Sequence, residues 1–442
     1  KGAVASMICA QMLFDQMFVI EGAYRHMDFN PTPGTLTNAM YPAGVISAPP
    51  TVTIQTIGLA GLAISRMLYT SSDPALREEV QSCMGALNYP IDAISGIDQH
   101  GSPYASFLAD PVGGALGALS WRDGVNTGGW PWDLQSTMPN VGDNEIFYPL
   151  IYLWRKEIPN SGGVGKYRGG NSAEIAYVLN DTESLEHHTC SGHTIIPGNG
   201  LYGGDPTSRT RFMMVKGANV RENFATNAVM PGDLSDLGGE HINIAPKASE
   251  VLQESGDVWS LAWTAASGYG DPLERAPEMV IQDIEESYIT SDWARARCGV
   301  CIDDEGELDI NKTTTLREQM RQQRLSDATG LQGARVSVPE TADEVPVSEG
   351  LVVCTSPEGS CYVCRKCRTR IQAAEENFKT GCLKKETPVE EVGLSPIDPE
   401  LFIDDKIVYK EYICPGCGLI LQGDFGKSEN EDIWDIRLFL DQ

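Results

Sequence analysis

The chain has 442 residues and a formal net charge of −28, an excess of acid that argues against a nucleic-acid backbone or an anionic membrane surface as its partner. Hydrophobic residues make up 41% and charged residues 21% of the sequence, proportions typical of globular proteins. A chain of this length can bury a large core and is expected to hold more than one domain.

Two apolar helical patterns come first. One spans residues 2–25, and the other, Thr51–Tyr69, follows a pair of prolines. Polar Gln55, Ser65 and Arg66 interrupt the second pattern, which predicts a buried amphipathic helix and no membrane span. The sequence also shows no signal peptide, so we expect a cytoplasmic protein.

Glycine and aromatic residues are concentrated between residues 94 and 145. Glycines without a regular period indicate tight turns and close backbone approach, so this region is predicted to form loops that cover a sheet or a binding surface. Two strands are predicted after it. Ile146–Trp154 is an apolar run, and Glu174–Leu179 has an alternating pattern.

Three histidines and a cysteine, His187, His188, Cys190 and His193, lie within seven residues. Imidazole and thiolate groups can bind a transition metal, but this spacing fits no standard zinc pattern. We therefore predict that these side chains lie on the surface or in a loop. If they do function, contact with a ligand is favoured over a metal.

Val258–Arg275 combines a strand, a tight turn and a helix start in one stretch. Its apolar beginning suits a buried strand, and Ser267–Gly270 breaks that strand, since glycine tolerates a positive φ. Asp271 is then placed as an N-cap, with Pro272 at the first helical position and Glu274 completing a capping box. A helix N-terminus can also bind an anion, but a lone Gly-x-Gly is a weak signal for such a site.

Helices are predicted next over Glu278–Tyr288, Asp292–Arg297 and Thr313–Leu325. Between the last two, Cys298–Ile302 has the pattern of a strand and contains a C-x-x-C. Because side chains alternate along a strand, the two sulfurs would point to opposite faces, and no metal site is expected there.

Ser326–Gly350 is predicted to be a linker, since Ser, Pro, Gly and acidic residues dominate it without an apolar period. It divides the chain into a body, residues 1–325, and a C-terminal domain, residues 351–442, whose cores should therefore be separate. Seven of the twelve cysteines lie in this C-terminal domain, which marks it as a different kind of unit.

Two of the cysteine pairs repeat each other. The run YVCRKC at 362–367 is echoed by YICPGC at 412–417, each an aromatic-apolar strand end followed by C-x-x-C. Four thiolates at the tips of two strand pairs are the arrangement of a structural zinc ribbon. The gap of 46 residues between the pairs exceeds the usual range and predicts an insertion. The predicted ligands of one structural zinc ion are Cys364, Cys367, Cys414 and Cys417.

Cys361 could replace one of these ligands, because Cys361 and Cys364 also form a C-x-x-C, but the matching flanks favour Cys364 and Cys367. Rubredoxin holds iron with four similar cysteines, so iron is the alternative metal and zinc is preferred. Disulfides would require an oxidising compartment, for which the sequence carries no export signal.

Two other segments resemble the hydantoinase B/oxoprolinase family. Residues 159–170, PNSGGVGKYRGG, are similar to that family's run P-x-S-G-G-x-G-x-Y-R-G-G, and GYGDPLER at 268–275 resembles its Gly-Tyr-Gly-Asp-Pro-Leu segment. The resemblance implies a mixed α/β (α+β) body. The family's conserved region is longer on its N-terminal side, and the chain starts with Lys inside a helical pattern. We therefore expect that the chain covers only the C-terminal part of that body.

A zinc ribbon joined to such a body is similar to the ATP-dependent, biotin-independent ketone carboxylases, the acetone and acetophenone carboxylase group. That resemblance implies a subunit of a heteromeric complex that activates a ketone enolate and bicarbonate as phosphates and joins them into a β-keto acid. Its partners would be hydantoinase-A-like ATPase subunits and the remaining N-terminal part of the hydantoinase-B-like region. No G-x-x-x-x-G-K-[ST] motif occurs in the chain, so ATP and its Mg or Mn are expected on a partner or a missing part.

Two alternatives remain open at this point. The chain could belong to an ATP-dependent hydantoinase or 5-oxoprolinase, which shares the body but generally lacks the ribbon. It could also be a non-catalytic scaffold subunit that contributes only an interface and the ribbon. The motifs identify no catalytic or cofactor-binding residue, and they leave the ketone or ring substrate unspecified.

Overall fold

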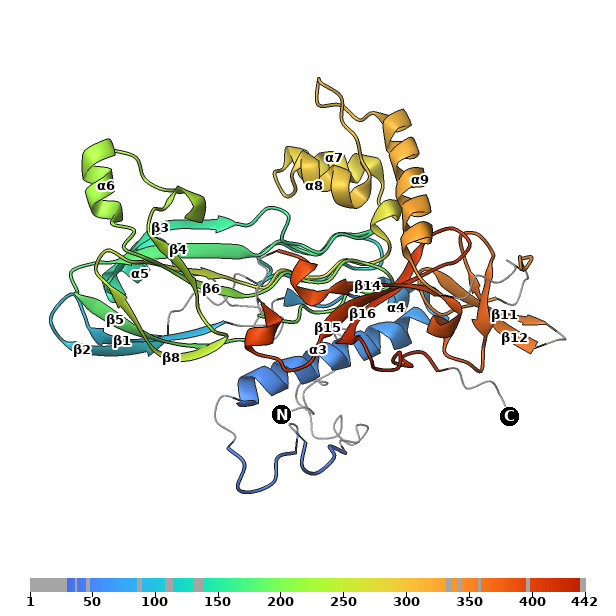
Figure 1. The fold of residues 1–442 in the computed structure, drawn as a ribbon, viewed down its shortest axis with the longest axis horizontal. Coiled ribbons are helices and arrows are strands. Elements are labelled where there is room, and N and C mark those ends of the chain that lie inside the picture. The colour runs from blue at the N-terminus through green and yellow to red at the C-terminus, as the bar shows by residue number, and fades with distance from the viewer. Residues whose placement is uncertain are drawn as a thin grey trace.

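The structure is a computed structural model that describes residues 30–35, 38–44, 48–85, 90–107, 114–129, 138–330, 336–340, 344–356, 359–394 and 398–437. The helix predicted over residues 2–25 lies outside these ranges. Figure 1 shows the two sheets of the body towards one end of the molecule and the cysteine-rich C-terminal part towards the other. The mixed helix and strand content agrees with the predicted fold class.

The helix predicted at Thr51–Tyr69 is present as α3, Ala48–Tyr69, and a short helix, α4 (Pro74–Glu78), follows it. In Figure 1 α3 runs beneath the C-terminal strands, and its Arg66 forms an ion pair with Asp435 at 2.8 Å. Within the described ranges, no helix combines the length and the apolar character that crossing a membrane would require.

The body is built on two antiparallel sheets that pack face to face, with strand orders β2-β1-β5-β8 and β3-β4-β9-β6-β7. His187 of the first sheet stacks on Trp259 of the second with ring centroids 3.8 Å apart, and apolar side chains fill the space around them. The strands are β1 (Ile91–Ile97), β2 (Pro103–Phe107), β3 (Leu150–Glu157), β4 (Ala173–Leu179), β5 (Ser184–Cys190), β6 (Arg211–Lys216), β7 (Glu240–Asn243), β8 (Lys247–Glu254) and β9 (Val258–Ala262).

The strand predicted at Ile146–Trp154 is wrong in its first half. A helix, α5 (Val141–Phe147), forms there because the Asn140 side chain accepts a hydrogen bond from the backbone of the first turn at 2.8 Å. Ile146 and Phe147 consequently lie on the surface, where they are 67% and 71% exposed. Strand β3 begins only after this helix.

The strand predicted at Glu174–Leu179 is confirmed as β4, but all of its residues are buried. One face of its sheet meets the other sheet. The opposite face is covered by α6 (Val220–Asn227) and a short 3-10 turn, η2 (Leu234–Asp236). A strand covered on both faces has no solvent side, so its residues do not alternate in burial.

The stretch that starts at Val258 forms a strand, a turn and a helical turn in the predicted order. Gly270 has a φ of +72°, and the Asp271 side chain accepts a hydrogen bond from Leu273 N at 2.8 Å. The helical turn is a single 3-10 turn, η3 (Pro272–Glu274). The Glu274 carboxylate does not form the predicted capping box but pairs with Arg321 at 2.6 Å.

The three predicted helices that follow are present and stand on the side of the molecule opposite α3 (Figure 1). The strand predicted at Cys298–Ile302 is wrong, because Cys298 ends a π-helical turn and Gly299 then reverses the chain at a φ of +62°. Thr313 Oγ1 accepts a hydrogen bond from Cys301 N at 3.0 Å, so a helix satisfies this backbone in place of a neighbouring strand. The helices are α7 (Pro277–Glu285), α8 (Ser291–Trp293), η4 (Ala294–Cys298) and α9 (Ile310–Asp327).

The two glycine motifs lie side by side in the body, together with the loop at 198–206. Backbone hydrogen bonds join these segments, for example from Gly268 N to Asp205 O at 2.9 Å. A Cβ added at Gly268 would lie 2.2 Å from Val164 O. Glycines are therefore needed at these positions because the loops pack through their backbones, with no room for side chains between them.

Gly270→Ala should reduce the stability of the chain by about 1–2 kcal/mol, because alanine is strained at positive φ and its Cβ would also lie 2.9 Å from Lys166 Cβ. Gly306→Ala is a matched control, since Gly306 has a φ of +89° but open space around it. Chemical denaturation of both variants would separate strain from contact. A Gly270→Ala protein as stable as the parent would show that the turn is read wrongly.

The C-terminal part, called the ribbon from here on, contains two antiparallel sheets with orders β10-β11-β12-β13 and β14-β15-β16. Short 3-10 turns, η5 (Phe378–Gly381), η6 (Val389–Glu391) and η7 (Pro399–Leu401), lie in the insertion that the long cysteine gap predicts. The strands are β10 (Val345–Pro346), β11 (Leu351–Ser356), β12 (Gly359–Cys364), β13 (Arg370–Ala373), β14 (Leu383–Pro388), β15 (Ile407–Ile413) and β16 (Ile420–Lys427).

Candidate metal centre and its junction with the body

The four predicted ligand cysteines meet at the ends of strands β12 and β15. Their sulfur atoms all lie within 4.8 Å of one another, and this group could hold a metal ion. Cys364 Sγ is 3.8 Å from Cys417 Sγ, and Cys367 Sγ is 3.5 Å from Cys414 Sγ. Zinc–sulfur bonds of about 2.3 Å in a tetrahedron imply sulfur–sulfur distances of about 3.8 Å, so the cluster has the size that such an ion requires.

The repeat in the sequence is also a repeat in the backbone. Arg368 N donates to Cys364 O at 2.9 Å, and Gly418 N donates to Cys414 O at 3.1 Å. Both donors have positive φ, +62° for Arg368 and +72° for Gly418. A register shift precedes each C-x-x-C, in the ladders of β12 and of β15. Each pair is thus a tight turn that directs two sulfurs to the same point.

Gly416 has a specific place in the second turn. A Cβ at this position would lie 2.1 Å from Thr369 Oγ1 and 2.7 Å from Cys367 Sγ. The two turns are therefore packed so closely that a side chain at Gly416 would push one sulfur away. Cys361 is not part of the group and instead lies opposite Cys354 in the β11–β12 ladder.

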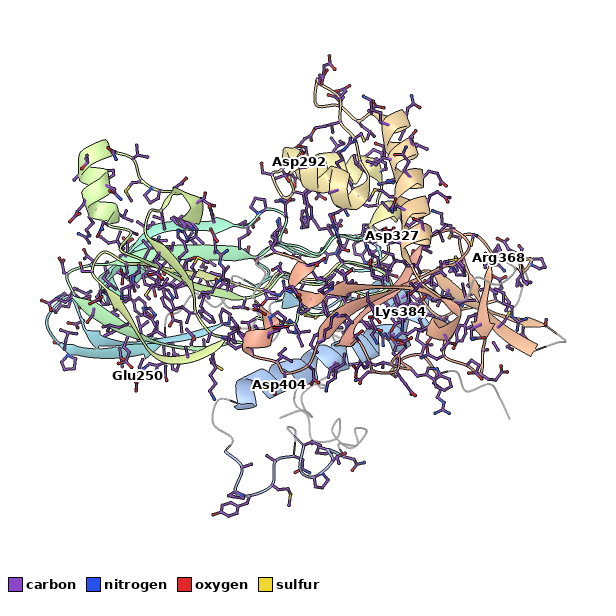
Figure 2. The ribbon with its side chains drawn as sticks, in the orientation of Figure 1. Glu250, Asp292, Asp327, Arg368, Lys384 and Asp404 are labelled. Atoms are coloured by element: carbon purple, nitrogen blue, oxygen red, sulfur yellow. The ribbon has the colours of Figure 1, made fainter. Side chains whose placement is uncertain are left out.

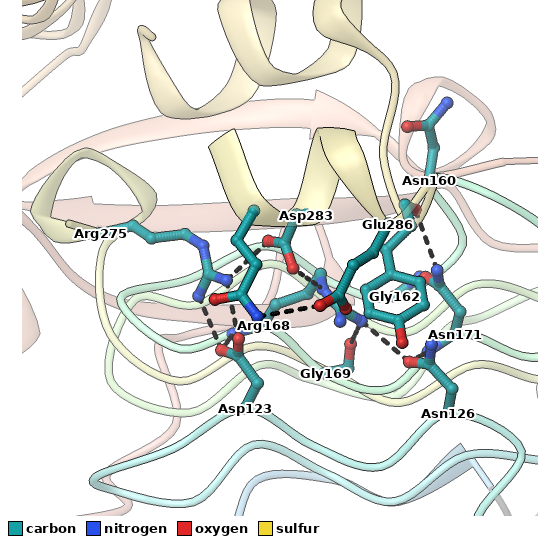
Figure 3. Close-up of polar contacts among 12 residues, drawn as sticks. Asp123, Asn126, Asn160, Gly162, Arg168, Gly169, Asn171, Arg275, Asp283 and Glu286 are labelled. Carbon is teal, nitrogen blue, oxygen red and sulfur yellow. Dashed lines mark hydrogen bonds and ion pairs between the residues drawn. The ribbon is translucent and has the colours of Figure 1, made fainter. Parts of the chain in front are cut away.

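A second cluster lies in the body, where charged side chains from both family-like motifs form a buried chain of ion pairs (Figure 3). Arg275, which is completely buried, donates to both carboxylate oxygens of Asp123 at 2.7 Å and to Asp283 at 2.6 Å. Asp283 then accepts from Arg168 Nε at 3.3 Å. Two arginines and two aspartates alternate, so the buried charges are balanced.

Burial and charge act against each other in this network. Burial alone would raise the pKa of Asp123, but the hydrogen bonds and charge of Arg275 hold it below its usual range. Burial raises the pKa of Asp283 above its usual range, although Arg168 and Arg275 oppose that shift. Of the two carboxyl groups, Asp283 therefore holds a proton more readily.

A pocket of 450 Å³ opens beside this network, and Asp123, Arg168 and Asp283 form part of its wall. Arg168 Nη1 donates to Asn126 Oδ1 at 3.1 Å, and the Arg168 guanidinium lies 5.0 Å from the ring centre of Tyr288. The pocket is mostly polar and could hold a small polar molecule. No catalytic role is assigned to its residues.

The body and the ribbon meet at Asp271, whose side chain is fully buried. Besides capping η3, this carboxylate accepts from Arg324 Nη1 at 2.7 Å and from Ile420 N at 2.9 Å. Arg324 also donates to Gly418 O, at 3.2 Å, in the second cysteine turn. A residue of the glycine motif in the body is thus fastened directly to the metal-ligand turn of the ribbon.

Further contacts show that the two cores are not separate, as the predicted linker had implied. The C-terminal end of α9, where Figure 2 labels Asp327, lies beside the ribbon, and Leu325 packs with ribbon residues Ile413 and Ile420. Glu349, within the predicted linker, accepts from Lys166 at 2.7 Å. The domain boundaries at 325 and 351 themselves stay predictions.

The structure places the histidine cluster differently from the prediction. His187 is fully buried, with Nδ1 3.0 Å from Asp92 Oδ1 and Nε2 3.0 Å from Gln253 Oε1, so the surface-or-loop prediction is wrong for it. His188, the next residue of β5, points to the opposite side and pairs with Glu186. Among the described residues, these side chains form no group that could hold a metal.

Sequence reasoning missed the residues that connect motifs across the body. Asp283 had a local signal, because it lies with Val280 on the buried face of helix α7, where a carboxylate needs a partner. Asp123 had no such signal. Its partners, Arg275 and the backbone N–H of Arg168, are 152 and 45 residues away in the sequence.

The fold and the site together define a protein of two fastened parts, a mixed α/β body with close-packed glycine loops and a ribbon with four clustered thiols. Residues 2–272, more than half of the chain, match the family Hydantoinase B/oxoprolinase, and residues 340–439 match the family Acetone carboxylase gamma subunit. The chain therefore belongs to the hydantoinase B/oxoprolinase family.

Several known proteins are similar in sequence. The acetone carboxylase alpha subunit of Xanthobacter autotrophicus is 27% identical over 248 residues, covering 52% of this chain and 32% of that protein. The acetophenone carboxylase delta subunit of Aromatoleum aromaticum is 24% identical over 328 residues, with 70% and 46% covered. The B-type polypeptide of a putative D-/L-hydantoinase from a Pseudomonas species is 27% identical over 287 residues, with 64% and 42% covered. The chain thus spans about a third to a half of the length of these relatives.

Two solved structures share the fold. A nucleotide-free acetone carboxylase superposes with a TM-score of 0.53 at 24% identity, over 63% of this chain and 38% of that chain. The ATP-dependent caprolactamase of Pseudomonas jessenii superposes with a TM-score of 0.54 at 19% identity, over 71% and 50%. These neighbours confirm the predicted hydantoinase-B-like fold of the body.

Proposed function

We propose that this chain is part of a subunit of an ATP-dependent, biotin-independent ketone carboxylase of the acetone and acetophenone carboxylase type. The reaction joins bicarbonate to a ketone enolate, both activated as phosphates, and yields a β-keto acid. One observation carries the proposal: a hydantoinase-B match and an acetone carboxylase gamma-subunit match occur in the same chain. The structure adds that the two parts share an interface centred on Asp271.

The proposal includes partners. Hydantoinase-A-like ATPase subunits would supply the ATP site with Mg or Mn, because the chain contains no P-loop motif. The remaining N-terminal part of the hydantoinase-B-like region would complete the body, since the chain spans less than half of its carboxylase relatives. The small substrates would be a ketone and bicarbonate in the cytoplasm.

We also infer that Cys364, Cys367, Cys414 and Cys417 bind one zinc ion with a structural role. Four clustered sulfurs, two matching turns and the close fit at Gly416 support this inference. Four thiolates would fill a tetrahedral coordination sphere and leave no position for substrate or water. The ion would hold the two ribbon sheets together. Iron is the alternative metal for the same ligands.

A hydrolase that opens amide rings is the second candidate. It is favoured by the similarity to the hydantoinase relative and to the beta chain of the caprolactamase of Pseudomonas jessenii, which is 27% identical over 304 residues. The ribbon match argues for the carboxylase instead, because ring hydrolases of this kind generally lack that part.

ATP hydrolysis by the complex, purified with its ATPase partners, would distinguish these functions. We expect hydrolysis that requires both bicarbonate and a ketone such as acetone or acetophenone, with a β-keto acid as product. Hydrolysis stimulated by hydantoin or 5-oxoproline without bicarbonate would instead establish the ring hydrolase. A complex that is active without this chain would identify it as a scaffold.

A further inference from the structure

A cavity of 310 Å³ lies between the body and the ribbon, on the side of the junction formed by strands β14 and β15. The body contributes Pro272, the η4 turn and α9, and the ribbon contributes both strands and the start of β16. Ligand sites occur preferentially at such boundaries between two units. This cavity is separate from the four cysteines and from the Arg168–Asp283 network, whose residues do not line it.

One wall of the cavity is a square of polar side chains. Lys385 and Glu411 are directly opposite each other in the β14–β15 ladder, and Thr387 is opposite Tyr409 two residues further along. Because residues two apart on a strand face the same side, all four side chains point from one face of the sheet towards the body. The wall therefore presents an ammonium, two hydroxyls and a carboxyl group at one place.

These groups have no partners of their own among the described residues. Tyr409 is only 6% exposed, and its ring packs on Phe425 with centroids 4.8 Å apart, yet its hydroxyl makes no hydrogen bond within the described part of the chain. Lys385 and Glu411, both half-buried, likewise have no ion pair there. A buried hydroxyl beside an unpaired ammonium is costly unless something else satisfies them.

The other charges around the cavity are already neutralised or lie at its edge. Asp205 pairs with Arg297 at 2.6 Å, and Asp327 accepts from Gln323 at 2.6 Å. Burial raises the pKa of Glu411, which favours its protonated, hydrogen-bond-donating form. Inside the cavity, donors therefore outnumber acceptors, and Lys385 is the cation that lacks a counter-ion among the described residues.

The remaining surface of the cavity is apolar. Side chains from both parts provide it, namely Pro272, Met320, Val392 and Ile420. A ligand that fits must therefore combine one compact acceptor group with a short hydrocarbon portion. An inorganic ion such as phosphate would satisfy the donors but leave this apolar surface facing water.

We infer that the cavity between body and ribbon binds a small organic monocarboxylate, with its carboxylate on Lys385 and Tyr409 and its hydrocarbon part against Met320, Val392 and Ile420. This site goes beyond the proposed carboxylation and does not depend on it. Because both parts of the chain contribute to the site, an occupied cavity holds the body and the ribbon together. The ligand thus acts on the same junction as Asp271.

Three probes with the same short tail and different charge test the inference on the full-length chain, by calorimetry or ligand-observed NMR. Butyrate should bind saturably, and neutral butyramide and cationic butylamine should bind at least about tenfold more weakly, as the loss of a charge-assisted contact implies. Butyramide or butylamine binding as tightly as butyrate would overturn the inference. Phosphate or bicarbonate competing equally well at the same residues would overturn its apolar part.

Variants locate the site. Lys385→Met should weaken butyrate binding about tenfold or more, and Tyr409→Phe about fivefold, the effect of one lost hydrogen bond. Lys406→Met is the matched control, because it removes the same charge from an exposed residue outside the cavity. Circular dichroism shows that each variant is folded. Unchanged binding in a folded Lys385→Met protein, or no saturable binding in the parent, would contradict the site.

Discussion

Removal of the metal from the four-cysteine centre should unfold the ribbon and also loosen the adjoining face of the body. Structural zinc sites of this kind supply about 10 kcal/mol or more of apparent binding free energy, which becomes folding free energy when the apo site does not persist. The effect should not stop at the ribbon, because Gly418 and Ile420, just after the second cysteine pair, are bonded to Arg324 and Asp271 of the body.

The measurement combines metal analysis with hydrogen exchange. A strong chelator, or Cys417→Ser, should lose the metal, lower the thermal stability, and raise exchange in both ribbon sheets, in α9 and around Asp271. Exchange in the distant sheets of the body should change little, because their core is built from other residues. The purified parent should contain one zinc ion with four sulfur ligands by X-ray absorption.

Cys361→Ser is the matched control for this experiment. It changes a cysteine of the same strand, β12, that lies outside the sulfur cluster, so the metal should remain. Metal loss in Cys361→Ser, or nitrogen and oxygen ligands in the absorption spectrum, would contradict the assignment. Four sulfurs around iron would leave the ligands unchanged but give the site a role in electron transfer.

Asp271→Ala should reduce stability by about 3–5 kcal/mol, the cost of leaving a buried charge without its partner. The substitution would strand Arg324 and two backbone N–H groups, those of Leu273 and Ile420, at the junction. Asp309→Ala is the matched control, because Asp309 caps the exposed start of α9 and makes no contact with the ribbon. That variant should lose only about 1 kcal/mol, typical of a helix cap. Equal losses in chemical denaturation would show that the junction adds nothing.

The pH dependence of the parent and of Asp271→Asn provides a further check on the same residue. Burial would raise the pKa of Asp271, but the charge of Arg324 and three hydrogen bonds lower it below its usual value. A carboxyl whose pKa is lower in the folded state stabilises the fold above its unfolded pKa of about 3.9, and that stabilisation is lost as pH falls through the folded value. The difference in stability between the parent and Asp271→Asn should therefore be constant near neutral pH and shrink under strongly acidic conditions.

The metal ligands could be predicted from the sequence because their signal is local. The runs at 362–367 and 412–417 are near copies, and the structure gives each the same turn with a positive φ after its second cysteine. Strand β9 and the Asp271 cap followed for the same reason, since apolar runs and capping residues act within a few positions.

The failures came where neighbours distant in sequence override a local pattern. Cys298–Ile302 has the residues of a strand, but its backbone finds its partner in Thr313 of α9 and not in another strand. His187 was expected near the surface, yet the facing sheet supplies Trp259 and buries it completely. Composition alone made Glu349 part of a spacer, although it contacts Lys166 of the body.

The sequence by itself determined the two kinds of unit, the four sulfur ligands and the glycine motifs, because repeats, spacings and turn residues are encoded in short segments. Only the tertiary structure decided how the units are joined. Asp271 and Ile420 are 149 residues apart, and Lys166 and Glu349 are 183 apart, so no periodicity or motif in the chain relates them. Those pairs form because folding buries charges that must then find partners, and a partner is selected by its position in space and not by its distance along the chain.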